Sequence, residues 1–388
     1  MKKSYLMIAA VAALFAACAE KDTFKEAVQE DVAIGFNATL VSKVTKAEIT
    51  TAYLREVDAS NQIYHDFGVF GYKASQSNFT LFDNEQLTVV RTGAGSDQSP
   101  YVYDWTHTTV RFWDKSSTAT YTFYAYAPYN AYNATGSETG ISFTKIPVIT
   151  KIQANHIDDV VVATPYIAQT KEQCTSHTGI TDHATTHSTY VPFVFNHIFS
   201  RLSFKVKTHK DYSATATFTV KSIELNFPSD KSSNEDQVSW SGNGTTNTIT
   251  YSTNYAATSA PTPSTTYETT VYSNTTGQVA TVTPAPIGDA FIVTPVNTAQ
   301  PKHAFNIKLT YDVEYWNTDN SSAGKETDCI ATGRIDTKVV ENVESPAYNP
   351  AANESWVITI DINPDQIDFC ADKVNGWDSP DEYTGEVK

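Results

Sequence analysis

The stretch V-A-I-G-F-N-A-T-L at residues 32–40 decides the fold class of this chain. Apolar side chains occupy every second position, and the members of this face are Val32, Ile34, Phe36, Ala38 and Leu40. Alternation with a period of two indicates a β-strand that buries one face and exposes the other. We therefore expect the folded part of the chain to begin with a strand at residues 32–41.

Short runs of the same kind recur along the chain, with Gly, Pro, Asn and Ser clusters between them. They lie at residues 67–72, 110–113, 120–126, 141–143, 160–163, 191–195, 200–206, 218–227, 279–282, 290–293, 304–315 and 356–362. No long segment shows helical periodicity. Many short strands separated by turn residues are typical of an all-β sandwich or barrel.

The length of 388 residues favours two domains over one, because a single core rarely grows that large. A stretch rich in Thr, Ser and His at residues 173–189 interrupts the strand pattern. We therefore expect an N-terminal sandwich at residues 32–195 and a C-terminal sandwich at residues 196–388. Residues 229–272, rich in Ser, Thr, Asn and Pro, predict long surface loops around one or two strands.

The beginning of the chain has the parts of an export signal. Lys2 and Lys3 precede an apolar run too short to span a membrane, and two alanines lead into Cys18. The L-F-A-A-C sequence ending at Cys18 resembles a bacterial lipobox, with Phe15 where leucine is commoner. We expect a signal peptide at residues 1–17, a lipid on Cys18 and a charged tether at residues 18–31. The alternative is an ordinary signal peptide with a chance cysteine.

The charge balance bears on partners. The chain has 43 acidic and 27 basic residues, a net charge of −16, and no basic patch. Such a surface repels a phosphate backbone, so we expect no nucleic-acid partner.

The sequence holds few candidates for a metal or a disulfide. Cys174, His177, His183 and His187 have spacings that zinc accepts, but they lie in a polar stretch with no strand or helix to hold them. We therefore predict no metal site and no cofactor, with these four residues as weak candidates. Cys174, Cys329 and Cys370 could form one disulfide, and their spacing does not say which.

The sequence also shows no clear catalytic motif. The chain has no G-x-S-x-G elbow and no phosphate-binding glycine loop. Asp158, Asp159 and Asp361 border strands, where solvated ends are the ordinary interpretation, and His197 is expected at the edge of the core. We predict that the protein is not an enzyme.

Several stretches, in this order, resemble the fimbrillin family of Bacteroidales, the subunits of type V pili. They are the lipobox at Cys18, T-K-A at 45–47, F-G-V-F-G-Y at 67–72, Y-T-F-Y-A-Y-A-P at 121–128, D-D-V-V-V-A at 158–163, V-P-F-V-F-N-H-I-F-S-R-L-S-F at 191–204 and a closing tryptophan segment at 374–377.

The resemblance implies two transthyretin-like β-sandwich domains in tandem and a lipidated precursor at the outer membrane. It further implies that a protease cuts after a basic residue and removes the first strand, and that a strand from a neighbouring subunit fills the groove. Lys46 and Arg55 are the candidate cutting sites. Family members often carry arginine where this chain has Lys46, so Arg55 is slightly favoured.

The function so predicted is that of a structural subunit or an accessory or tip adhesin of a pilus on the cell surface. Its partners would be other pilus subunits and a ligand on a host or bacterial surface. The alternative is a tethered glycan-binding surface lipoprotein that does not polymerise. Trp105, Trp113 and Trp240 could supply its sugar-stacking surface, although large aromatic side chains more often fill sandwich cores.

Overall fold

A computed structural model describes most of the expected folded region. The residues it describes are 31–40, 66–74, 79–92, 102–146, 149–152, 159–176, 190–226, 238–244, 249–255, 269–293, 305–317, 319, 321–335, 354–363 and 366–374. Cys18, Lys46, Arg55 and the three histidines of the zinc hypothesis lie outside these residues.

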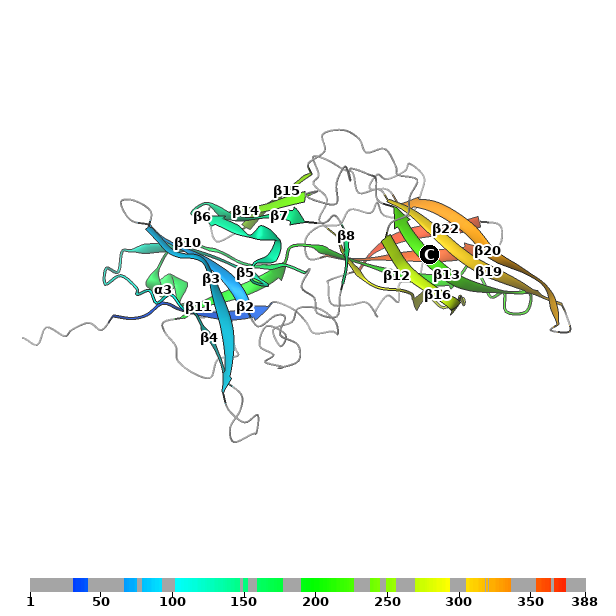
Figure 1. Ribbon diagram of the computed structural model, residues 1–388, viewed down its shortest axis with the longest axis horizontal. Helices are drawn as coiled ribbons and strands as arrows, with labels where there is room; N and C mark the ends of the chain where they lie inside the picture. Colours follow the sequence, from blue (N-terminus) through cyan, green and yellow to red (C-terminus); the bar gives the residue numbers. More distant parts are fainter. Residues whose placement is uncertain are drawn as a thin grey trace, which may run out of the picture.

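The described strands form two lobes (Figure 1). In the first lobe, a sheet of eight strands runs in the order β1 (Gly35–Leu40), β11 (Tyr190–His197), β9 (Val161–Ala163), β5 (Thr120–Ala127), β2 (Asp66–Ala74), β3 (Phe79–Thr92) and β4 (Val102–Thr106), with β10 (Tyr166–Thr170) beside β5. A second sheet has the order β15 (Ile249–Tyr255), β14 (Val238–Gly244), β7 (Gly140–Ile146) and β6 (Thr135–Ser137). The short helices η1 (Ala131–Asn133) and α3 (Lys171–Cys174) belong to this lobe.

The second lobe also contains two sheets. One has the order β22 (Gln366–Val374), β21 (Ser355–Asn363), β12 (Ser200–Thr208), β18 (Phe291–Val293) and β8 (Ile149–Lys151), with β17 (Ala285–Pro286) beside β12. The other has the order β16 (Thr269–Val279), β13 (Ala216–Asn226), β19 (Phe305–Trp316) and β20 (Ser322–Ile335). Alternate residues of β12 and β21 pack against alternate residues of β13 and β19, which form the core of this sandwich.

Both faces of the eight-stranded sheet are buried at its centre. On β5, Tyr121 and Phe123 pack into a core with β1, while Tyr124 and Tyr126 pack on the other face against β7. A strand buried on both faces has no need of polar side chains at alternate positions. This explains why β5 is an almost unbroken aromatic run.

The expected all-β fold with sandwiches in tandem is confirmed. Two expected strands are wrong: residues 280–282 lie outside any strand, because β16 ends at Val279, and residues 110–113 form an irregular segment with a single isolated bridge between Ala33 and Phe112. The apolar residues at 110–113 suggested a strand, but Val110 and Phe112 are exposed, so this segment buries no regular face. Among the described residues, no helix is long and apolar enough to cross a membrane.

Strand pairing crosses the expected domain boundary at residues 195–196 in both directions. β14, from the second half of the chain, pairs with β7 of the first half. β8, from the first half, pairs with β18 of the second half. The boundary itself stays a prediction, and the two exchanged elements tie the lobes together.

Candidate functional site: the groove of the first strand

β1 is the outer strand of the eight-stranded sheet and runs parallel to β11. Gly35 pairs with Tyr190 and Leu40 with Phe195, so the strand is in register along its whole length. Ile34, Phe36 and Ala38 are buried, each at most 1 % exposed, as the alternation predicts. Val32 is partly buried against the same core, and the side chain of Leu40 lies outside the described set.

Phe36 inserts into a cage of aromatic rings from four different segments. Its ring stacks on Phe193 with a centroid separation of 5.6 Å and meets Phe82 and Phe123 edge-on at 5.1 and 5.7 Å. The His107 ring closes the cage at 5.7 Å. We call the space lined by these four residues the first-strand groove, because the Phe36 side chain of β1 fills it. Without β1, these rings and one edge of β11 would meet water, which is unfavourable for both.

A strap at residues 107–113 holds the beginning of β1 from the side opposite β11. The amide of Ile34 donates to the carbonyl of Arg111 at 2.8 Å, and the amide of Trp113 donates to the carbonyl of Val32 at 2.9 Å. The His107 ring lies between two carbonyls, with Nε2 3.2 Å from that of Ile34. Backbone hydrogen bonds therefore hold β1 to the strap near its N-terminal end and to β11 along its length.

Glu85 fixes the strap to β3. Its carboxylate accepts hydrogen bonds from the amide and hydroxyl of Thr108, both at 2.9 Å, and from the amide of Thr109 at 2.8 Å. Burial opposes the ionisation of Glu85, but these hydrogen bonds outweigh it and hold its pKa below the ordinary value of glutamate. The negative charge on Glu85 is thus part of what keeps the strap in place.

The other candidate residues do not gather into a second site. Cys174 ends α3 and is fully buried, and burial raises the pKa of its thiol to about 12. Cys174, Cys329 and Cys370 are free thiols. In the part of the chain that the structure describes, no group of three His, Cys, Asp or Glu side chains could hold a metal ion.

Trp105 and Trp113 are each 5 % exposed and pack in the core of the first lobe, so they offer no face to a sugar. Only the backbone of Trp240, in β14, is described.

One buried pair was missed by sequence reasoning. Nδ1 of His197 lies 2.9 Å from Oδ2 of Asp159, and the two side chains are 2 % and 3 % exposed. Asp159 is therefore not at a solvated strand end, as the sequence had suggested. The sequence pattern could not show it, because β11 and the residues before β9 meet only through sheet pairing.

The fold has clear structural relatives. Over 89 % of this chain and 100 % of the other, it matches a fimbrial protein from Bacteroides vulgatus with a TM-score of 0.51 and 20 % identity. The fold is that of a fimbrial protein. The expected resemblance is thereby confirmed at the level of fold.

Two looser similarities add no argument. A candidate cell adhesion protein from Bacteroides uniformis matches over 89 % of this chain and 98 % of its own, with 12 % identity and a TM-score of 0.40. The tip fimbrial protein Mfa3 from Porphyromonas gingivalis matches over 90 % and 100 %, with 12 % identity and a TM-score of 0.37. No protein-family model and no curated protein matches the chain.

The cage around Phe36 predicts a large and specific cost of truncation. Phe36→Ala should lower the free energy of unfolding by about 3–5 kcal/mol, because it leaves a cavity among four rings. Chemical denaturation of the uncut protein measures this. Phe79→Ala is the matched control, since Phe79 is 54 % exposed and its loss should change stability by less than about 0.5 kcal/mol. Equal effects of the two changes would mean that β1 does not fill the groove.

The depressed pKa of Glu85 predicts acid sensitivity of the strap. Its stabilising contribution is fully present above the unfolded pKa, about 4.3, and is lost as the pH falls through the lower folded value. Glu85→Gln should therefore cost about 1 kcal/mol at pH 7, and the melting temperatures of variant and wild type should converge below about pH 4. The control Glu314→Gln, on β19, should differ from wild type at neither pH. If the melting temperature of Glu85→Gln stays as far below that of wild type at pH 3 as at pH 7, the charge on Glu85 does not have this role.

Proposed function

We propose that this protein is a subunit of a bacterial surface pilus, a structural subunit or an accessory or tip adhesin, assembled by proteolysis-triggered donor-strand exchange. The observation that carries the proposal is the position of β1: it is an outer strand, and its apolar side chains fill an aromatic groove. The fold shared with a fimbrial protein and the sequence resemblance to fimbrillins support it. No catalytic activity is part of the proposal.

The proposed path to assembly follows from the order of segments along the chain. Cys18 would carry a lipid that tethers the precursor to the outer membrane. The candidate cutting sites Lys46 and Arg55 follow β1, which ends at Leu40, and precede β2, which begins at Asp66. A cut at either site would break the covalent link between β1 and the rest of the fold. The strand would then be held only by β11, the strap and the groove.

We further propose β22 as the donor strand. β22 is the outer strand of its own sheet. Its residues 367–371 read I-D-F-C-A, and residues 34–38, which begin one residue before β1, read I-G-F-N-A. Because strand residues alternate between faces, both strands present isoleucine, phenylalanine and alanine in the same order on one face. The groove requires a small residue in third place, since Ala38 is fully buried opposite Phe193.

Transfer of β22 would bury more apolar surface than its present position does. Ile367 and Phe369 are only partly buried in the second lobe, where the Phe369 ring lies over Gly333 of β20. The equivalent positions in the groove, Ile34 and Phe36, are each 1 % exposed. Full burial of a large apolar side chain is worth about 1.5–3 kcal/mol relative to exposure, so these two partly buried side chains would gain part of that on transfer. The donor would have to run parallel to β11, as β1 does.

Blocking the cut should block assembly. The double variant Lys46→Ala and Arg55→Ala should stay folded and monomeric, because its own β1 still fills the groove. Size-exclusion chromatography after protease treatment measures polymerisation, and N-terminal sequencing of surface material identifies the cut. Wild type should start at Glu56 or Ala47 and polymerise, and Lys43→Ala in the same linker should behave as wild type. Fibres formed by the double variant would overturn the mechanism, and acyl-Cys18 as the sole N-terminus of wild type would favour the tethered binder.

Changing the donor strand should separate folding from assembly. Phe369→Ser should leave the precursor folded, since the ring is only partly buried, yet should prevent polymerisation of the cut protein. Asp368→Asn, on the exposed face of β22, is the matched control and should assemble normally. Electron microscopy of the two cut variants shows whether each forms fibres. Normal fibres from Phe369→Ser would exclude β22 as the donor.

A further inference from the structure

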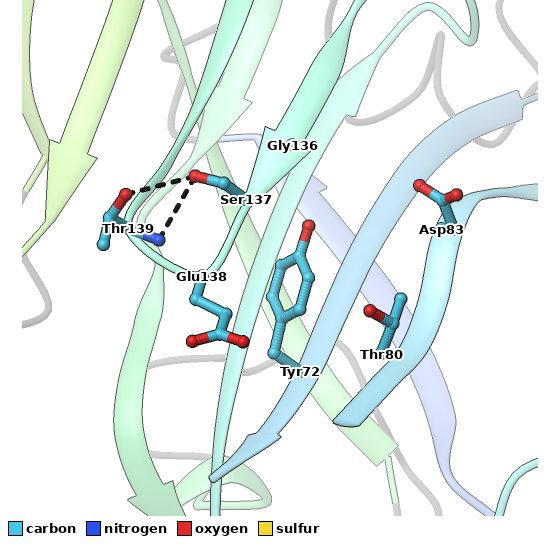
Figure 2. Close-up of a pocket in the computed structure, with 7 residues that line it drawn as sticks. All are labelled: Tyr72, Thr80, Asp83, Gly136, Ser137, Glu138 and Thr139. Atoms are coloured by element: carbon cyan, nitrogen blue, oxygen red, sulfur yellow. Dashed lines mark hydrogen bonds between the residues drawn. The ribbon is translucent and has the colours of Figure 1, made fainter. Parts of the chain in front are cut away.

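A pocket of about 510 Å³ opens on the first lobe, on the far side of the eight-stranded sheet from the first-strand groove (Figure 2). Its lining residues come from β2, β3 and the β6–β7 hairpin: Tyr72, Thr80, Asp83, Gly136, Ser137, Glu138 and Thr139. Pockets of this volume accommodate small ligands.

Tyr72 gives the pocket a hydroxyl without a protein hydrogen-bond partner, on a side chain that is otherwise buried. The side chain is 7 % exposed, and none of the hydrogen bonds among the described residues uses its hydroxyl. Figure 2 shows that hydroxyl directed into the space between Ser137 and Asp83. Burial, and then the nearby negative charge of Asp83, raise the pKa of Tyr72 to about 12, so the hydroxyl keeps its proton at neutral pH and can donate a hydrogen bond. A donor that no protein group uses is available to a ligand or to water in the pocket.

Asp83 is held at the pocket by a distortion of β3. Against β2, this strand has an extra residue on each side of Phe82, between the pairs Val69–Glu85 and Gly71–Phe82 and between Gly71–Phe82 and Tyr72–Thr80. Asn84, next to Asp83, has a φ of 51° and accepts a 2.6 Å hydrogen bond from the Tyr126 hydroxyl. Bulges of this kind redirect side chains and are common beside binding sites.

Glu138 is presented by the tight turn of the β6–β7 hairpin. Ser137 pairs with Gly140, which leaves Glu138 and Thr139 as the turn residues. The Ser137 hydroxyl fixes the turn, 3.1 Å from the Thr139 hydroxyl and 3.3 Å from the Thr139 amide. The hairpin can lie this close to β2 because Gly136 rests on the Phe70 ring, where a Cβ atom would come within 2.3 Å of a ring carbon.

We propose that this pocket binds a neutral sugar residue of a surface glycan, with Tyr72 as hydrogen-bond donor and Asp83 and Glu138 as acceptors. A sugar ring carries several hydroxyls that donate to carboxylates and oxygens that accept from a phenol. The lining supplies two carboxylates and, among the described residues, no basic side chain, so an anionic sugar would be repelled. The contact runs through the Tyr72 hydroxyl, because its ring is too buried to stack on a ligand. The proposal deepens the adhesin role by naming a ligand class, and it does not depend on strand exchange.

The test uses the full uncut chain, so that failure of assembly cannot affect it. Saturation-transfer NMR is recorded with the methyl glycosides of glucose, galactose and mannose and with N-acetylglucosamine, with N-acetylneuraminate as the anionic comparison. At least one neutral sugar should bind and N-acetylneuraminate should not. Tyr72→Phe should weaken binding about fivefold and Glu138→Gln at least tenfold, as expected for loss of a neutral and a charged hydrogen bond.

Two controls keep the result decisive. Glu314→Gln, on β19 of the other lobe, should bind as wild type does, and Tyr72→Phe should keep the wild-type melting temperature because its hydroxyl has no protein partner. The proposal is overturned if no neutral sugar binds, or if both pocket variants bind as wild type does. Calcium binding at Asp83 and Glu138 in the absence of any sugar binding would likewise overturn it, and would indicate a cation site instead.

Discussion

The packing of Phe36 among Phe82, Phe123, Phe193 and His107 is the interaction on which the rest of the first lobe depends. These rings come from segments far apart in sequence, and one inserted side chain brings them together. Ile34 and Ala38 extend the same insertion along β11. A single outer strand thus completes a core that the remaining strands cannot close, and it does so from a position at the end of the sheet. Strands so placed can be replaced by another strand with the same pattern.

This constraint links several features of the molecule. The strap and Glu85 keep β1 in place in the uncut chain, and the linker that follows β1 carries the basic residues. β22 repeats the isoleucine, phenylalanine and alanine spacing but leaves two of the three side chains partly exposed. In the proposed exchange, a partly exposed outer strand of one copy would take the fully buried place of β1 in the next.

Much of the fold could be predicted from the sequence, because strands with one buried face leave a period-two pattern. β1 and β12 carry it, whereas β2 and β5 are buried on both faces and are recognised instead as continuous apolar runs. Pro128 also marks the end of β5 at Ala127, as expected of a residue that cannot donate to a ladder. The sequence did not predict β20, because its residues are mostly exposed and polar. This strand is held in the sheet by its pairing with β19. The crossing of β14 to β7 could not be predicted, since register between distant strands is fixed by tertiary packing.

The sites divide in the same way. The alternation predicted which residues of β1 are buried, and the structure adds the cage and the strap. The pocket at Tyr72 had no sequence signal: F-G-V-F-G-Y reads only as a strand, and the bulges in β3 and the hairpin above them arise from distant contacts. The Asp159–His197 pair was hidden for the same reason.

The exchangeability of β1 is the central claim, and strand replacement in the cut protein measures it most directly. Wild type cut after Arg55 would be incubated with an isotope-labelled peptide of residues 31–40 and examined by native mass spectrometry. We predict that the labelled peptide replaces the original strand while the rest of the chain stays folded, and that a peptide with Phe36→Asp does not. Retention of the original strand until the whole protein unfolds would contradict the account.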